Sequence, residues 1–258
     1  MIQTFLSKYK TIYASLFVIT FWYLCHLFIQ STIIPNPLHT FVTFFRLLQG
    51  DMLLHVGASL LRISVSVFIA IVIGVSLGLF LGLHNKLDRI FGPVVYLLYP
   101  LPKIAFLPIF MILFGLGNTS KIILITVIIL FQILVTIRDS VKGLSKELFY
   151  SIRSLGASKV QIYRHLILPA ITPKLLTALR ISVGTSISVL FFAENYATRY
   201  GIGYFIMDAW IRINYLEMYA GIIAISILGL VVFKAIDLIE HGICKWTLLE
   251  KGENNSYF

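Results

Sequence analysis

The sequence predicts an all-α, polytopic membrane protein with six transmembrane helices. Of its 258 residues, 59% are hydrophobic and only 12% are charged, whereas a soluble domain carries about 25% charged residues. The mean hydropathy is +0.92, and several apolar runs reach the roughly 20 residues that a helix needs to cross a bilayer. These runs are continuous rather than alternating, which excludes a transmembrane β-barrel. We therefore expect one membrane domain over residues 1–258, with a core at about residues 55–238.

The first apolar run follows Lys8 and Lys10 and in this respect resembles a secretory signal. It is long for the apolar part of a signal peptide, and no small-residue cleavage site follows it. We therefore interpret it as a retained span. The six predicted spans are Thr11–Ile29, Leu60–Leu83, Ile90–Phe114, Lys121–Ile137, Leu175–Tyr196 and Tyr219–Ile239.

The basic residues set the expected orientation. With the N-terminus inside, fifteen of the 21 Lys and Arg residues fall in cytoplasmic loops or at the inner edge, and five fall outside, namely Arg46, Arg62, Lys121, Arg199 and Arg212. Cytoplasmic loops normally carry such an excess, so we expect a multi-pass protein of the cell (plasma or inner) membrane with both termini cytoplasmic. The same bias accounts for the net charge of +10. A nucleic-acid partner is not expected, because no basic and aromatic platform lies outside the spans.

Glycines in the second span predict close helix packing. Gly74, Gly78 and Gly82 recur at four-residue spacing, which exposes a flat strip where another helix can approach. Two further short helices are expected on the outer side. One is a packing helix after Pro37, with apolar residues at helical spacing, and the other is an amphipathic segment that follows a break at residues 201–203.

The third span is interrupted by prolines, at positions 93, 100, 102 and 108. Each proline removes a backbone donor and pushes the helix off its axis. Broken helices at membrane depth are tolerated where they are buried in protein or line a watery cavity. Lys103 lies in this stretch, where an ammonium costs at least ~2.5 kcal/mol. Two interpretations stay open: Pro102 and Lys103 line a substrate route, or Lys103 caps carbonyls freed by Pro102.

The fifth span carries a polar face formed by Ser182, Thr185, Ser186 and Ser188, with Glu194 at its outer end. Hydroxyl groups in membrane helices often bond back to their own backbone. Four together with a carboxylate favour a wet or inter-helix face, and Ser182, Thr185, Ser186 and Glu194 are therefore candidates for the translocation pathway. An alternative places Glu194 at the outer interface, paired with Arg199.

A long basic segment at about residues 139–173 separates the fourth and fifth spans. Its apolar residues recur at helical spacing on both sides of Gly156-Ala157-Ser158, which predicts two short amphipathic helices with a bend between them. Gly156 can adopt the positive φ that such a bend often requires. Leu168 and Pro169 are expected to end the second helix before the fifth span begins. Such a segment is suited to contact with a protein outside the membrane.

This segment resembles the cytoplasmic loop of importer-type ABC permeases, E-A-A-x-x-x-G-x(9)-I-x-L-P. The match runs through Tyr150-Ser151-Ile152, Gly156 and Leu166 to Leu168-Pro169, without a gap between the glycine and the proline. Tyr150 stands where the glutamate would be, and Ser151-Ile152 replace the two alanines. Glu147, one turn earlier, is a possible stand-in for that glutamate. The residues expected to couple to an ATPase are Glu147, Tyr150, Ser151, Ile152, Arg153, Leu155, Gly156, Ala157, Ser158, Lys159, Leu168 and Pro169.

The resemblance covers nearly the whole chain. Leu101–Gly117, Lys146–Pro173 and Gly201–Ala209 are similar to permeases for nitrate, sulfonates, taurine and pyrimidine thiamine precursors. It implies a type I ABC importer permease fold and a half-transporter that is not itself an enzyme. Two permease copies, most simply a homodimer, would form the pore in the lipid membrane. Two ATPase subunits would bind ATP and Mg²⁺ and dock below, and a separate binding protein would deliver the substrate outside. The chain itself needs no cofactor, and it contains no G-x-x-x-x-G-K-[ST] phosphate loop.

Rival functions are less consistent with these residues. An ion-driven secondary transporter would carry ionisable groups at mid-membrane and internal repeats, and only Lys103 and Glu194 qualify. A membrane enzyme would need a convergent set of acid, base or nucleophile, but the six histidines are scattered and Cys25 and Cys244 have no metal spacing. A scaffold would leave the broken span unexplained. Lys103 favours an organic anion such as a sulfonate. An aliphatic sulfonate, taurine or a nitrate-like anion is therefore the expected solute, and a vitamin-like heterocycle such as a pyrimidine thiamine precursor stays an alternative.

Overall fold

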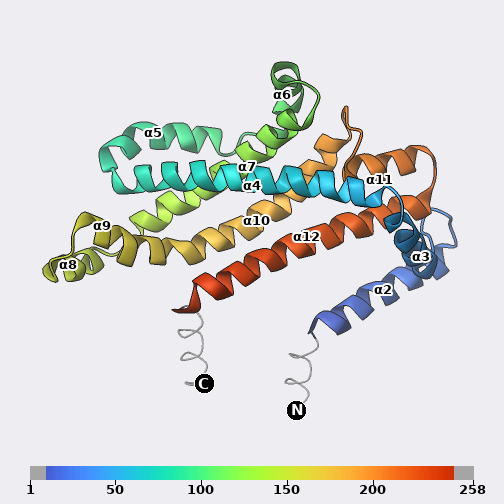
Figure 1. Ribbon diagram of the computed structural model, residues 1–258, viewed down its shortest axis with the longest axis horizontal. Coiled ribbons are helices and arrows are strands. Elements are labelled where there is room, and N and C mark those ends of the chain that lie inside the picture. The colour runs from blue at the N-terminus through green and yellow to red at the C-terminus, as the bar shows by residue number, and fades with distance from the viewer. Residues whose placement is uncertain (1–9, 247–258) are drawn as a thin grey trace, which may run out of the picture.

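The computed structural model describes residues 10–246, and every regular element in that range is a helix (Figure 1). The elements are α2 (Lys10–Ile29), α3 (Pro37–Leu48), α4 (Met52–Leu83), α5 (Asn85–Leu98), the 3₁₀ helix η1 (Lys103–Phe106), α6 (Leu107–Phe114), α7 (Asn118–Lys142), α8 (Lys146–Ser154), α9 (Lys159–Ile162), the π-helical segment η2 (Tyr163–Ile167), α10 (Leu168–Glu194), α11 (Ile202–Ile211) and α12 (Tyr215–Ile243).

Within residues 10–246, four continuous helical stretches are long and apolar enough to cross a membrane: α4, α7, the run from α9 through α10, and α12. If the bent pair formed by α5 and η1–α6 is one broken span, the number of candidate spans in this range rises to five. The first predicted span corresponds to α2, a shorter apolar helix. The expected all-α membrane architecture is therefore confirmed, while six full spans are not all present as long helices.

The short helices that connect the long ones lie at the two opposite ends of the bundle. Figure 1 shows α8 and α9 at one end of the long axis and α3 and α11 at the other. The helices alternate in direction between these ends, as the predicted topology requires. The basic segment at residues 146–159 thus lies opposite the two outer helices. Lys8 and Lys251, which also supported the predicted orientation, lie outside the described residues.

The packing of α4 on α7 depends on the predicted glycine strip. A Cβ atom added to Gly74 would lie 3.0 Å from the Ile133 side chain, and one added to Gly82 would lie 2.8 Å from the Val141 side chain. The missing side chains let the two backbones approach closely. The fully buried Ile129, Ile133 and Ile137 of α7 then form part of the core. The prediction of tight packing at this strip is confirmed.

The third predicted span is not one helix. α5 ends at Leu98, the chain continues through Pro100 and Pro102, and η1–α6 leaves at 83° to α5. Pro102 immediately precedes η1, and Pro108 lies in the first turn of α6, where a missing N–H costs no helical hydrogen bond. The expected break is confirmed, and it lies at residues 99–102.

The expectation that Pro169 ends a helix was wrong. The helix continues from Lys159 to Glu194. The π-helical segment η2 precedes the proline, and the N–H of Leu168 donates to the carbonyl of Tyr163. A local π turn absorbs the irregularity that a proline otherwise introduces into a helix. The connection between the long helices is therefore shorter than residues 139–173.

The first two helices lie at the edge of the bundle. The Trp22 ring of α2 stacks on Tyr219 of α12 with ring centroids 5.3 Å apart. α3 begins with Asn36, whose side chain accepts a hydrogen bond from the N–H of Leu38, and Pro37 occupies its first turn. The predicted short packing helix after Pro37 is thus confirmed, and its buried Phe44 faces the core.

Candidate functional site

The basic segment forms a bent elbow, defined here as residues 146–162. α8 ends at Ser154, and Gly156 has a φ of 76°, which lies in the left-handed region. Ser158 then caps α9: its hydroxyl accepts from the N–H of Gln161, and the Gln161 side chain accepts from the N–H of Ser158. Both signals, the glycine that permits the turn and the reciprocal cap that restarts the helix, are local. The two predicted helices and their bend are confirmed.

The elbow presents an apolar tip between charged side chains. Leu155 is 84% exposed and Tyr150 is 65% exposed, and Arg153 and Lys159 are exposed beside them. Ile152 differs, because it is half-buried and packs against the core of the chain. Ile152 therefore anchors the elbow to the core of the chain.

The structure places Glu147 and the other predicted coupling residues in the elbow or in the first turn of α10. Glu147 lies in the first turn of α8. Its own backbone N–H and the hydroxyl of Ser145 hold the pKa of its carboxyl below the ordinary value. Ser151 and Ser158 are exposed and Ala157 is half-buried. Leu168 and Pro169 lie beyond the elbow, in the first turn of α10.

Three cavities follow one another along the bundle, each with a wall made by α5, the break after it or α6. The inner cavity, about 600 Å³, lies along α5 and is lined by Asp88, Arg89, Gly92, Pro93, Tyr96, Leu97 and Arg138. The middle cavity, about 290 Å³, lies at the break. The outer cavity, about 530 Å³, lies against α6, and Ile104 lines both it and the middle cavity. We call this series the cavity row.

Lys103 reaches into the middle cavity and also caps the break. Its Nζ donates to the carbonyls of Tyr99 at 2.7 Å and Leu98 at 3.1 Å. The same Nζ lies 4.7 Å from the ring centre of Phe131, which provides a cation–π contact. Thr185 lines this cavity together with Lys103. Both interpretations of Lys103 therefore describe the same position: it caps freed carbonyls on the wall of a cavity.

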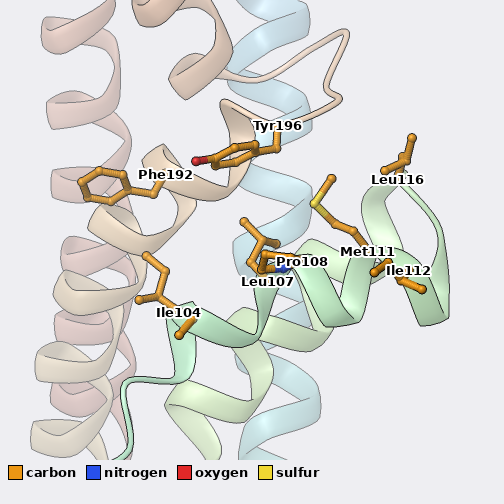
Figure 2. Close-up of a pocket in the computed structure, with 9 residues that line it drawn as sticks. Ile104, Leu107, Pro108, Met111, Ile112, Leu116, Phe192 and Tyr196 are labelled. Carbon is orange, nitrogen blue, oxygen red and sulfur yellow. The ribbon is translucent and has the colours of Figure 1, made fainter.

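The outer cavity is almost entirely apolar. Figure 2 shows Phe192 and Tyr196 on one wall, with Leu107, Pro108 and Met111 facing them from α6. Ile104 closes the cavity toward the break. Pro102 does not line either the outer or the middle cavity.

The inner cavity has an excess of positive charge. Asp88 accepts hydrogen bonds from Arg138 and from Lys142, both near the inner end of α7. Arg89, on the same cavity wall, is exposed. The lining thus holds Arg89 and Arg138 against the single carboxylate of Asp88.

The polar side chains of the fifth predicted span do not form one face. Ser182 and Ser186 are fully buried, and Ser186 donates to the backbone carbonyl of Ser182. Thr185 is exposed toward the middle cavity, and its hydroxyl donates to the carbonyl of Ile181. Only Thr185 of these candidates lines the cavity row, because successive positions of a helix point in different directions.

Glu194 is paired with Arg62, not with Arg199. Its carboxylate is 0% exposed and accepts hydrogen bonds from Arg62, from the Ser59 hydroxyl at 2.8 Å and from the N–H of Gly203 at 2.8 Å. Arg199 is exposed. Glu194 therefore lies inside the outer end of the bundle and does not line the cavity row.

Gly201 and Gly203 make room for this carboxylate. A Cβ atom on Gly201 would lie 2.5 Å from the Glu194 side chain, and one on Gly203 would lie 2.6 Å from the Phe191 carbonyl. The role of Arg62 could not be read from spacing alone. The available signal was one arginine and one glutamate, each isolated near the outer end of an apolar run.

Within residues 10–246, no group of three His, Cys, Asp or Glu side chains is placed to hold a metal ion.

Comparison with known proteins gives the family. Residues 70–244 match the family described as "Binding-protein-dependent transport system inner membrane component". The taurine transport system permease protein TauC of Escherichia coli (strain K12) is 33% identical over 192 residues, which cover 74% of this chain and 70% of TauC. The putative aliphatic sulfonates transport permease protein SsuC of Bacillus subtilis (strain 168) is 28% identical over 219 residues, 84% of this chain and 79% of SsuC.

Two further similarities bear on substrate and fold. The formylaminopyrimidine transport permease protein ThiX of Halalkalibacterium halodurans is 29% identical over 84% of this chain and 87% of ThiX. A chain of the MetNI methionine ABC transporter, solved in inward-facing conformations, superposes with a TM-score of 0.64 at 24% identity, over 73% of this chain and 94% of that one. This second similarity shows the shared fold. With its matched family and its membrane helices, the chain belongs to the binding-protein-dependent transport system inner membrane components, the permease subunits of ABC importers.

Proposed function

We propose that this importer permease conducts a small solute with an anionic group, of the aliphatic sulfonate, taurine or nitrate kind, along the cavity row. The charge of the row is the observation that carries the proposal. Arg89, Arg138 and Lys103 line it, and Asp88 is the single carboxylate among its lining residues. Walls of one charge sign raise the local concentration of the opposite ion. The names of the relatives TauC and SsuC are consistent with such a solute.

Transport is driven through the elbow in this proposal. A permease of this family is a transporter subunit rather than an enzyme, so ATP and Mg²⁺ are bound by separate ATPase subunits. The exposed tip at Leu155 and Tyr150 sits in a groove on an ATPase, with Arg153 and Lys159 at the rim. Closure of the ATPase pair then moves the elbow as a rigid body and tilts α7 and α10, to which it is attached.

The complete importer contains further chains. We propose a pore of two permease copies, most simply a homodimer, with one ATPase under each elbow and a binding protein at the outer end. Both termini and the elbow face the cytoplasm. The exposed apolar side chains of α5 and α6 that do not line the cavity row, such as Ile90, Val94 and Leu113, face lipid or the second copy.

A heterocyclic vitamin precursor is the second candidate. The rings of Tyr99 and Phe131 in the middle cavity and of Phe192 in the outer cavity offer stacking surfaces for a flat ligand. The relative ThiX, named for formylaminopyrimidine, supports this alternative.

Uptake into vesicles that contain the whole importer distinguishes these candidates. Radiolabelled taurine, an alkanesulfonate, nitrate and formylaminopyrimidine are offered with ATP inside, and Lys103→Met is compared with Lys103→Arg. We expect the anion to be transported, with Lys103→Met reducing uptake about tenfold and Lys103→Arg retaining most of it, because a charged contact contributes about 1.5–3 kcal/mol. If formylaminopyrimidine were the one solute taken up, the heterocycle rather than the anion would be the assigned substrate. Uptake on a proton gradient without an ATPase would identify a secondary transporter.

A further inference from the structure

Two buried cations hold the outer loop that joins α10 to α11, defined here as residues 195–201. Lys121 of α7 is 1% exposed, and its Nζ lies 3.5 Å from the carbonyl of Ala197 in this loop. Arg62 of α4 is 4% exposed, and its Nη2 donates to the carbonyl of Tyr200 at 2.8 Å. His55 of α4 also contacts the backbone of Gly201, so side chains from two different helices hold the loop backbone at Ala197, Tyr200 and Gly201.

The two cations are themselves held in place. Lys121 Nζ also lies 3.1 Å from the carbonyl of Leu116 and 3.2 Å from that of Gly117. Arg62 is oriented by Glu194 and by Asn118, whose Oδ1 accepts from Arg62 Nη2 at 2.8 Å. Because charges taken out of water need such partners, neither side chain moves without breaking several contacts.

The loop carries Tyr196 over the outer cavity. Tyr196 lines that cavity opposite α6 (Figure 2). In sequence it lies between Glu194, which is buried in the Arg62 pair, and Ala197, whose carbonyl contacts Lys121. The contacts of Glu194 and Ala197, which precede and follow Tyr196 in sequence, therefore fix the backbone from which its ring extends.

We propose that Arg62 and Lys121 are positioning residues of an outer gate. In the conformation described here they hold the Tyr196 loop over the outer cavity. When the loop moves away from α4 and α7 while the Arg62–Glu194 pair stays intact, the carbonyls of Ala197 and Tyr200 exchange these cations for water, and the cavity opens outward. Backbone carbonyls lose little in this exchange, since water replaces the donors. The gate is independent of the identity of the solute.

The test measures access to the outer cavity. The probe is a thiol at position 111, made by Met111→Cys in a Cys25→Ala chain, because Met111 lines that cavity. The permease is assembled with its ATPase in right-side-out vesicles without nucleotide, and labelling by a membrane-impermeant maleimide is timed. We expect Lys121→Met and Arg62→Lys each to speed labelling about tenfold, as loss of a charged hydrogen bond would, and Lys121→Arg to label like the parent.

Arg212→Met is the matched control. Arg212 is also at the outer end, but it pairs with Asp208 at 2.9 Å and Glu217 at 2.8 Å and does not contact the loop. We expect this control to label within twofold of the parent. Unchanged labelling in both Lys121→Met and Arg62→Lys, or equally fast labelling in Arg212→Met, overturns the proposal. If the Lys121→Met protein does not accumulate in the membrane, the Arg62→Lys variant alone tests the proposal, again by its labelling rate relative to the parent. Since no solute is added, failure here is separate from failure of the anion assignment.

Discussion

Gly78 of α4 lies directly against Ile137 of α7. A Cβ atom added to Gly78 would be 2.8 Å from the Cβ atom of Ile137 and 2.8 Å from the carbonyl oxygen of Leu134. Carbon atoms in favourable contact stay about 3.5–4.0 Å apart. The distance between these two helices is therefore set by the absence of one side chain.

Replacing this glycine should separate the helices. Gly78→Ala is expected to lower the free energy of unfolding by about 1–3 kcal/mol, the usual cost of overpacking. The control is Gly57→Ala in the same helix, where an added Cβ would contact nothing within 4 Å. That change should be neutral or slightly stabilising. Thermal unfolding of the two purified variants in detergent compares them, and an equal melting temperature would contradict the packing argument.

Gly156 should be required for coupling rather than for insertion. Its φ of 76° is incompatible with proline, which fixes φ near −65°, so Gly156→Pro should abolish ATP-coupled uptake while the protein still reaches the membrane. Gly156→Ala should give an intermediate loss, because the left-handed region costs about 1–2 kcal/mol for other residues. The measurements are vesicle uptake and the amount of permease in the membrane.

Gly242→Ala is the control for these two variants, since a Cβ there meets nothing within 4 Å and its φ is not positive. Normal uptake by Gly156→Pro at normal membrane level would refute the coupling role of the elbow.

The exposed tip of the elbow should be an ATPase contact. Leu155 is 84% exposed, so Leu155→Ser should leave the free energy of unfolding nearly unchanged and weaken co-purification of the ATPase at least tenfold. An apolar anchor in a binding pocket often contributes 2 kcal/mol or more. Ile213→Ser is the matched control, because Ile213 is 71% exposed at the outer end. Equal recovery of ATPase with both variants would argue against docking at the tip.

Arg180 of α10 joins α12 through two carboxylates. It contacts Asp237 at 2.7 Å and also pairs with Glu240. Arg180→Met removes the cation and leaves two neighbouring carboxylates, so the free energy of unfolding should fall by about 1–3 kcal/mol. The triple change Arg180→Met, Asp237→Asn and Glu240→Gln should recover most of this loss. Thermal unfolding checks both, and a failure to recover would show that Arg180 acts through packing instead.

Local signals predicted the elbow well. Gly156 was found at the bend that the sequence indicated, and the Ser158–Gln161 cap beside it, which had not been predicted, also acts within a few residues. Close packing at the glycine strip was also predictable, because the prediction did not depend on which helix packs against it. Pro169 was misjudged, since the π-helical turn before it depends on how the helix continues.

Long-range pairing was not predictable in the same way. Glu194 meets Arg62 across 132 residues of sequence, and Ser182 and Thr185 lie on different sides of one helix although they are three residues apart. Which polar groups face a cavity depends on the rotation and neighbours of each helix. Spacing along one helix does not contain that information.

The sequence by itself determined the membrane class, the break after α5, the bend at Gly156 and the side on which the basic residues gather. These follow from chain-local physics: apolar length, the missing donor of proline, the free φ of glycine and the charge of loops. Only the tertiary structure decided that Lys103 caps the break while lining a cavity, and that Glu194 is buried with Arg62. A buried charge takes whichever partner the packed helices bring to it, and that choice is made in space rather than along the chain.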